Sequence, residues 1–315
     1  MLAFFANIFG YVLKLLYDIV GNYGWAIILF SVIVKGIMIP ISIKQQRTMK
    51  KNEKIQAELK QIQFKYKNEP EKLNQEMMAL YKREGMNPFS GCLSSIIQII
   101  LLFSVFLLVR QPLTYMVKMD KDVISNMEKI VAEQNTNTKG AYEEIAVIQY
   151  IKGLDSEKSE NKEKESKEKD SENKDKDFNI KEYANQANLN MDFFGIDLTQ
   201  VPSKNPTDIK TLIIPVLYVI SSFISIRFSM STTKKKEKEE KKLITDGTDK
   251  EDEKYNPTED MNKTMVWMMP IMSVTIAIIA PLGLALYWLM NNILMIVERL
   301  VINKILNKEE AEENA

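Results

Sequence analysis

The chain has 315 residues, of which 45% are hydrophobic and 27% charged, and its 42 basic and 42 acidic residues leave no formal net charge. Long apolar blocks alternate with highly charged segments, which is typical of a polytopic membrane protein and excludes an ordinary soluble domain. The absence of histidine and the single cysteine, Cys92, exclude Ser-His-Asp and Cys-His nucleophile systems, histidine metal sites and an internal disulfide. We therefore expect no enzymatic activity, no cofactor and no metal, and we find no nucleic-acid-binding motif.

Residues 1–20 combine a broad apolar face with two charged residues, Lys14 and Asp18, one helical turn apart. They lack the basic n-region of a standard signal peptide. The pattern favours an amphipathic helix that lies in the membrane interface, and a short membrane span is the alternative. Residues 21–24 read Gly-Asn-Tyr-Gly and predict a break in the helix.

Residues 24–43 form the first predicted membrane span and contain Lys35 near their middle. A charge at that depth costs about 3 kcal/mol or more, so such residues usually face a partner or a watery cavity. We expect Lys35 to have no resident counter-ion, because no Asp or Glu occurs in the other apolar stretches that we searched, residues 91–109, 211–226, 265–281 and 282–297. Two interpretations stay open. The lysine is neutral and hydrogen-bonded to serine or backbone groups, or it is charged in a hydrated groove and awaits an anion from a substrate.

Residues 44–88 form the most basic segment beside any predicted span, and residues 44–84 contain eleven Lys and Arg against six Asp and Glu. The positive-inside rule places this segment in the cytoplasm and the N-terminus outside. Apolar residues recur every three or four positions on both sides of Pro70, and Gly85 follows the second run, so we predict an antiparallel helical hairpin. The basic side chains that we expect to bind partners are Lys44, Arg47, Lys50, Lys51, Lys54, Lys82 and Arg83.

Residues 90–112 form the second predicted span, in which Ser94 and Gln98 share a helical side. A buried glutamine needs partners or water, so we expect Gln98 to face the same polar interior as the lysine of the first span. Residues 113–210 form a long external loop with apolar residues at helical spacing on its flanks. The middle of this loop, residues 155–177, is a charged run that cannot bury enough apolar surface to fold, and we expect it to be disordered.

Residues 211–230 form the third predicted span and contain Ser221 and Ser225. A serine in a span usually returns its hydroxyl hydrogen bond to the backbone of its own helix, and lining a polar interior is the alternative. Residues 231–262 follow as a second charged loop on the cytoplasmic side, and we expect disorder over much of this loop.

Residues 263–281 and 282–301 form two further spans joined by a Pro-Leu-Gly turn signal on the external side. The last span contains Trp288 near the turn, and Asn291 and Asn292 lie deeper in the apolar run, where both amides need partners. Residues 302–315 form a short cytoplasmic tail. Taken in order, these elements predict an all-α polytopic membrane protein with five transmembrane helices and a cytoplasmic antiparallel helical hairpin.

Three features occur in a characteristic order. A span with a central basic residue runs into Pro40-x-Ser42-x-Lys44-Gln45-Gln46. A basic hairpin ends in Leu80-Tyr81-Lys82-Arg83-Glu84-Gly85-Met86-Asn87-Pro88. The last two spans meet at Pro281-Leu282-Gly283-Leu284-Ala285-Leu286-Tyr287-Trp288. Together these features resemble the YidC/Oxa/Alb family of membrane protein insertases, in its five-span form known from Gram-positive bacteria.

The resemblance implies a hydrophilic groove that is open to the cytoplasm and to lipid and closed towards the outside. Lys35 takes the place of the family's basic groove residue, which is usually arginine, and Trp288 takes that of an aromatic residue at the groove's edge. Lysine keeps the charge but lacks the bidentate fork of a guanidinium group. The groove residues that we predict are Lys35, Ser31, Gln98, Ser94, Ser221, Ser225, Trp288 and Asn291.

The resemblance also implies a multi-pass protein of the bacterial plasma membrane that inserts nascent membrane proteins, with the ribosome and the Sec translocon as candidate partners. The groove would take a hydrophilic segment of the client protein and release its apolar helix into the lipid bilayer. One alternative is a membrane-anchored assembly factor that only docks partners. A secondary transporter is disfavoured because we see no internal repeat and no acid inside a span, and an intramembrane enzyme is disfavoured by the lack of histidine and of paired acids.

Overall fold

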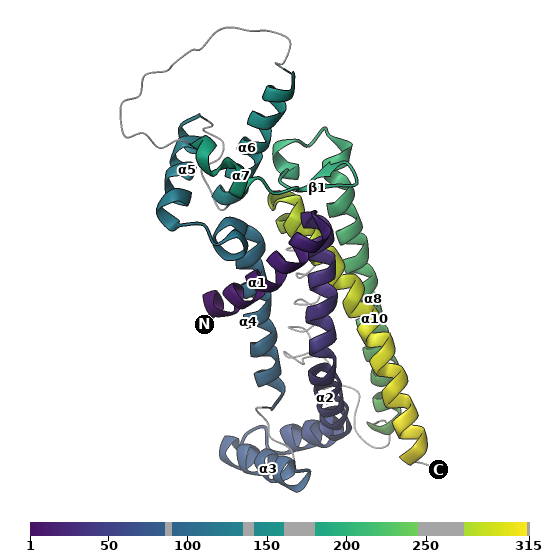
Figure 1. The fold of residues 1–315 in the computed structure, drawn as a ribbon. Helices are drawn as coiled ribbons and strands as arrows, with labels where there is room; N and C mark the ends of the chain where they lie inside the picture. The colour runs from purple at the N-terminus through teal and green to yellow at the C-terminus, as the bar shows by residue number, and fades with distance from the viewer. Residues whose placement is uncertain (86–89, 135–141, 161–179, 245–273, 314–315) are drawn as a thin grey trace. The chain divides into compact units, whose positions relative to one another are not determined.

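The computed structural model describes residues 1–85, 90–134, 142–160, 180–244 and 274–313 (Figure 1). These residues are mostly helical, which confirms the all-α class. The helices are α1 (Leu2–Val20), α2 (Tyr23–Lys65), α3 (Pro70–Arg83), α4 (Ser90–Arg110), α5 (Lys121–Gln134), α6 (Glu143–Glu160), α7 (Ile180–Ala187), α8 (Ile209–Ile244) and α10 (Leu282–Glu313). Between them lie the π-helix η1 (Leu113–Val117), the strands β1 (Asp192–Phe193) and β2 (Ile196–Asp197), and the 3-10 helix η4 (Pro202–Lys204).

The chain divides into two compact units. Unit 1 consists of Met1–Val32, Leu101–Ile220 and Ile271–Asn291. Unit 2 consists of Ile33–Ile100, Ser221–Pro270 and Asn292–Ala315. The long helices α2, α4, α8 and α10 each contribute residues to both units.

Within the described part of the chain, three helices are long and apolar enough to cross a membrane, Leu2–Val20, Tyr23–Thr48 and Leu282–Glu309. Ile99–Arg110 and Ile209–Ser225 are shorter apolar helices that coincide with the second and third predicted spans. Most of the fourth predicted span lies outside the described residues, and residues 274–279 at its end are helical. The count of five spans and the interfacial position of α1 therefore stay predictions.

In unit 1, α1 packs closely on η1 through Gly10. A Cβ atom on Gly10 would lie 1.8 Å from the carbonyl oxygen of Tyr115, so the two backbones can approach this closely only because glycine has no side chain. Ala6 and Leu13 lie on the same helix face and are fully buried. As predicted, α1 ends at Gly21, whose φ of 64° is left-handed.

A buried carboxylate, Glu144 of α6, holds the start of η1. It accepts hydrogen bonds from the backbone N–H groups of Leu113 (2.7 Å) and Thr114 (3.1 Å) and from the Thr114 hydroxyl (2.5 Å). Burial raises the pKa of Glu144 to about 7, although the hydrogen bonds from Thr114 and Leu113 favour the ionised form and oppose this shift. Unit 1 therefore contains an internal group that titrates near neutral pH.

The β1–β2 hairpin leads into the segment that receives the start of α10. The hairpin turns at Phe194, which has a left-handed φ of 51°. The backbone N–H groups of Leu282 and Gly283 then donate to the carbonyl oxygens of Gln200 and Leu198, both at 2.9 Å. First-turn N–H groups have no partner inside their own helix, so this segment supplies what α10 lacks.

In unit 2, α3 folds back beside the C-terminal part of α2 as a helical hairpin (Figure 1). Its buried core is Ile55, Leu59 and Leu80, with Ile62, Met77 and Tyr81 packed against it. The second arm has Pro70 in its first turn and is followed by Gly85 at a φ of 61°. The first arm is not a separate helix, because α2 continues from the predicted span through Pro40 to Lys65. The cytoplasmic location of this hairpin stays a prediction.

Two predictions of disorder are partly wrong. Helix α6 continues to Glu160, so residues 155–160 of the charged external run are helical. Helix α8 continues to Ile244, so residues 231–244 of the second cytoplasmic loop are helical as well. In both places Lys and Glu, which are good helix formers, extend a helix whose nucleation cost has already been met. The rest of both segments, residues 161–177 and 245–262, lies outside the described residues.

We expect Gly10→Ala to destabilise the α1–η1 contact by roughly 2 kcal/mol, because the new methyl group overlaps a backbone carbonyl that cannot rotate away. Thermal unfolding of the detergent-solubilised protein measures this loss. The matched control is Gly153→Ala in α6, where nothing lies within 4 Å of the added Cβ atom and alanine favours the helix. A Gly10→Ala protein as stable as the control would contradict the close approach.

The raised pKa of Glu144 predicts a pH-dependent stability. The folded state binds this proton more tightly than the unfolded state, so the stabilising contribution is fully present below pH 4.5 and is lost as the pH rises to about 7. We expect the free energy of unfolding of unit 1 to fall by about 3 kcal/mol over this window, and Glu144→Gln to remove the slope. Hydrogen exchange of α6 amides between pH 4 and pH 8 measures it.

The control for this experiment is Glu143→Gln, because Glu143 is the exposed neighbour in the same helical turn. This variant should keep the slope of the unsubstituted protein. An unchanged slope in Glu144→Gln would show that another group titrates.

Candidate functional site

An ion pair between Lys35 and Glu298 joins α2 to α10 within unit 2. The Nζ atom of Lys35 lies 3.0 Å from Oε2 of Glu298, and the two side chains are 19% and 11% exposed. The expectation that Lys35 has no resident counter-ion is therefore wrong. Glu298 lies one residue beyond the stretch 282–297 that we searched for acids, and α10 continues past it as one helix.

Glu298 bonds to Lys35 through one carboxylate oxygen. Its other oxygen, Oε1, is buried and has no hydrogen-bond partner among the described residues. A buried acceptor without a partner costs roughly 1–3 kcal/mol, and more when it belongs to a charged group. The pair thus offsets the charge of the lysine and leaves Glu298 able to accept one more hydrogen bond.

A second polar contact in unit 2 connects α10 to α8. The side-chain amide of Asn292 donates to the hydroxyl oxygen of Ser222 at 2.7 Å and lies 3.4 Å from that of Ser221. Ser221 and Ser225 are buried, at 7% and 6% exposure. Of the two asparagines that we expected to need partners, Asn292 faces these serines, since one residue turns a helix by about 100°, and the groove role of Asn291 stays a prediction.

The remaining predicted groove residues have different surroundings. Ser31 in unit 1 donates its hydroxyl to the carbonyl of Ile27 in its own helix at 2.7 Å, which is the common role of a serine in a span. Trp288 is also in unit 1, and the centroid of its ring lies 5.8 Å from that of the Tyr218 ring. Asn291 is half-buried. The side chains of Ser94 and Gln98 lie outside the described residues, so their place in a groove stays a prediction.

The basic residues of the hairpin fall into two groups. Arg47 forms a bidentate pair with Glu309 of α10, at 3.2 and 2.6 Å, and Arg83 lies 2.6 Å from Glu58 across the hairpin. These arginines hold parts of unit 2 together, although exposed pairs of this kind stabilise a protein only slightly. The lysines with exposed side chains are Lys44, Lys51 and Lys82, Lys50 is half-buried, and the side chain of Lys54 lies outside the described residues.

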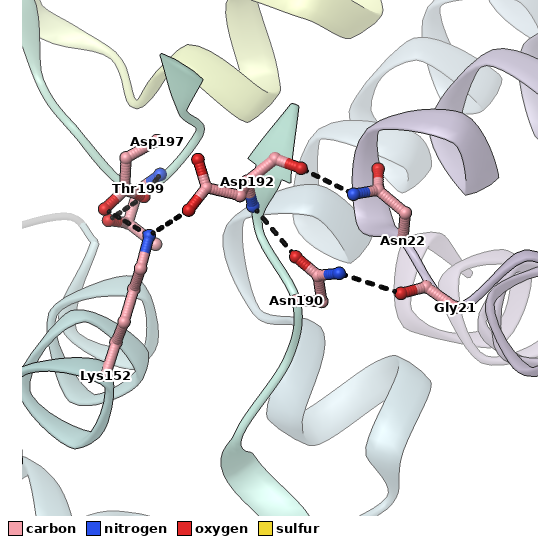
Figure 2. Close-up of polar contacts among 7 residues, drawn as sticks. All are labelled: Gly21, Asn22, Lys152, Asn190, Asp192, Asp197 and Thr199. Atoms are coloured by element: carbon pink, nitrogen blue, oxygen red, sulfur yellow. Dashed lines mark hydrogen bonds and ion pairs between the residues drawn. The ribbon is translucent and has the colours of Figure 1, made fainter. Parts of the chain in front are cut away.

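A third polar cluster lies in unit 1, and sequence reasoning missed it. Figure 2 shows Lys152 of α6 between Asp192 and Asp197 of the hairpin strands, 3.0 Å from each. Asp197 also accepts hydrogen bonds from the N–H and hydroxyl of Thr199. Burial opposes the charge on Lys152, but hydrogen bonds and attraction from Asp197 and Asp192 outweigh it and raise the pKa of the lysine.

The same cluster ties the hairpin to the break between α1 and α2 (Figure 2). Asn22 donates to the carbonyl of Asp192, and Asn190 donates to that of Gly21 at 3.1 Å. Asn22 also accepts the N–H of Trp25 at 3.2 Å and so caps α2, which its position before a helix could have indicated. The cluster's members bond to one another, so we regard it as structural.

Apolar helices of spanning length, an ion pair embedded among them and a basic helical hairpin define a polytopic α-helical membrane protein with a polar site inside its apolar helices. The chain belongs to the 60Kd inner membrane protein family, whose sequence model matches residues 15–310. This match confirms the predicted resemblance to the YidC/Oxa/Alb insertases.

Relatives with the name membrane protein insertase YidC match this chain over different lengths. The Treponema denticola protein is 25% identical over 298 residues, which is 95% of this chain and 37% of the relative. The Helicobacter pylori (strain ATCC 700392 / 26695) protein is 44% identical and the Francisella tularensis subsp. novicida protein 42%, each over 106 residues, 34% of this chain and 19% of the relative. The chain thus spans at most 37% of the length of these relatives.

We expect Asn292→Ala to lower the free energy of unfolding by about 1 kcal/mol, because hydrogen bonds between membrane helices have this order of strength. Asn291→Ala is the matched control, since it removes the same amide one position away, and it should have a smaller effect. Thermal unfolding in detergent micelles measures both. Equal losses in the two variants would show that the Asn292–Ser222 hydrogen bond does not add measurably to stability.

Proposed function

We propose that this protein is an insertase that helps nascent membrane proteins enter the lipid bilayer of a bacterial plasma membrane. The observation that carries the proposal is the partly exposed Lys35–Glu298 pair between two apolar helices, in a chain whose relatives bear the name of insertases. Apolar residues would serve packing at least as well as a buried ion pair does. Ionisable residues within membrane segments instead tend to mark the paths of polar substrates.

The client's short polar external segment enters the groove first, and Lys35 lowers the electrostatic cost of its acidic side chains there. Ser221, Ser225 and Asn292 replace part of the water that the segment loses. The client's apolar segment stays against lipid, and its burial drives release, so no nucleotide and no covalent step are needed. The other members of the proposed groove are Ser31, Ser94, Gln98, Trp288 and Asn291.

In this proposal the N-terminus lies outside the cell and α1 lies in the interface on the external side of the plasma membrane. The C-terminus and the α2–α3 hairpin lie in the cytoplasm. The hairpin receives the ribosome or the Sec translocon. Its exposed lysines, Lys44, Lys51 and Lys82, suit this role better than Arg47 and Arg83, because both arginines already pair with carboxylates of unit 2.

A secondary transporter is the second candidate, because Glu298 supplies the acid inside a predicted span that such carriers use. A docking factor is the third, supported by the exposed lysines of the hairpin. The response to substitution of Lys35 separates them. A docking factor tolerates Lys35→Ala, and a transporter shows solute flux in liposomes that contain no client.

The proposal predicts a graded response in liposomes reconstituted with the protein and supplied with a single-span client whose external segment is acidic. Lys35→Arg should insert this client less well than the unsubstituted protein but better than Lys35→Ala, because the charge remains while the guanidinium fork holds Glu298 more tightly. Lys35→Ala should insert it at least about tenfold less well, which corresponds to roughly 1.4 kcal/mol. Protease protection of the translocated segment scores insertion.

The matched client carries asparagine and glutamine in place of aspartate and glutamate, and its insertion should depend far less on Lys35. Equal insertion of the acidic client by all three proteins would remove the electrostatic role of Lys35.

A further inference from the structure

We infer that Glu298 is a resident substitute for the client's carboxylate, which occupies Lys35 between clients and sets how acidic a client must be to enter. This inference rests on the proposed insertase function and concerns the same site. The geometry points to it because the lysine already holds a carboxylate, at 3.0 Å, that belongs to its own chain.

Entry of an acidic client is an exchange of partners at Lys35. A lysine without a counter-ion would attract any anionic segment with its full charge. Because Glu298 already offsets that charge, the client gains only a difference in interaction free energy. This is the energy of Lys35 with the client's carboxylate minus its energy with Glu298. Clients with several acidic residues gain more than clients with one, and neutral clients gain nothing from the lysine.

Glu298 needs new hydrogen-bond donors when it is displaced from Lys35. A buried carboxylate that loses its cation is strongly unfavourable unless other donors replace it. Its Oε1 atom is buried and, in the described part of the chain, has no hydrogen-bond partner. An extended client segment carries backbone N–H groups that are free to donate, so they can bond to Oε1 as Glu298 leaves Lys35 and moves out of its buried position.

A lysine permits such an exchange of carboxylates. An ammonium group has three donors that rotate about a flexible stem, whereas a guanidinium group holds a carboxylate through a rigid fork. The pair here uses one carboxylate oxygen and is not fully enclosed, since the side chains are 19% and 11% exposed. Lys35 can therefore contact the incoming carboxylate while Glu298 is still bound, and the site need not pass through a bare buried charge.

The class of client that fits is an extended polar segment with at least one Asp or Glu and free backbone N–H groups. Glu298 acts as a specificity-determining residue, since it raises the acidity that such a segment needs. Removing its charge should make the site accept weakly acidic clients more readily and leave neutral clients unaffected.

The test uses the full chain in liposomes and three single-span client peptides that are identical except for zero, one or three Asp in the external segment. Fluorescence binding and protease protection measure affinity and insertion. We expect Glu298→Gln to improve both at least fivefold for the one-Asp client, less for the three-Asp client and not at all for the neutral one. The gain should vanish in the Glu298→Gln, Lys35→Ala double variant.

Glu298→Asp guards against loss of folding, because it keeps the charge and shortens the side chain by one methylene. It should weaken the pair and shift the preference in the same direction by a smaller factor. If neither variant changes the ratio of one-Asp to neutral insertion, or if both reduce insertion of all three clients alike, Glu298 is only structural and the inference is overturned.

The Lys35→Ala protein separates this inference from the proposed function. If Lys35→Ala loses acidic clients but Glu298→Gln leaves the preference unchanged, the inference fails and the function stands. If Lys35→Ala inserts acidic clients as well as the unsubstituted protein does, the electrostatic function fails, and the inference fails with it.

Discussion

Unit 2 depends on the requirement that a lysine within an apolar helix must find a negative partner. Lys35 of α2 pairs with Glu298 of α10. A second pair joins Arg47, 12 positions farther along α2, to Glu309, 11 positions farther along α10. At 1.5 Å per residue these intervals are about 18 and 17 Å, so the two helices run side by side in the same direction over this stretch. The largely buried Lys35–Glu298 pair therefore favours one register of α2 against α10, and the exposed Arg47–Glu309 pair agrees with that register but contributes little to it. Asn292 adds α8 to the same helix through hydrogen bonds.

Unit 1 is held together by a different kind of interaction. Its irregular segments, the π-helix η1 and the loop between α7 and β1, expose backbone groups that regular helices would satisfy internally. Glu144 accepts hydrogen bonds from two such N–H groups. The backbone N–H of Asn190 donates to the Tyr17 hydroxyl at 2.8 Å, and its carbonyl accepts the backbone N–H of Tyr23 at 2.9 Å. Buried backbone groups without partners are costly, so these hydrogen bonds stabilise a conformation that apolar packing alone could not.

Much of the fold could be predicted because its signals are local. Gly21 and Gly85 end helices through left-handed φ values, and Pro70 starts one, each as composition alone suggests. The continuity of α2 past the predicted end of the span at residue 43 was missed, and so was the extension of α8 to Ile244. Both errors come from treating a change in composition as a change in structure, although a helix already formed can continue through polar residues.

The candidate site was only half predictable for a related reason. A lysine in an apolar run is visible in the sequence, but its partner is 263 positions away. Only the packing of α2 on α10 selects Glu298 from among the acids near the end of a span. The same holds for Asn292 over Asn291, where a rotation of about 100° decides which amide meets a serine. Local patterns identify which residues are costly to bury, and tertiary structure decides what offsets that cost.

The lysine and its resident glutamate are best understood together. In the resemblance to the insertase family, the basic position is usually an arginine, whose fork would hold a carboxylate through two bonds and release it slowly. A lysine bound through one oxygen of Glu298 makes a weaker and more exchangeable pair, and it leaves the second oxygen, Oε1, without a partner among the described residues. An acid beside an arginine would tend to close the site, whereas an acid beside a lysine can occupy the site and still give way to a client.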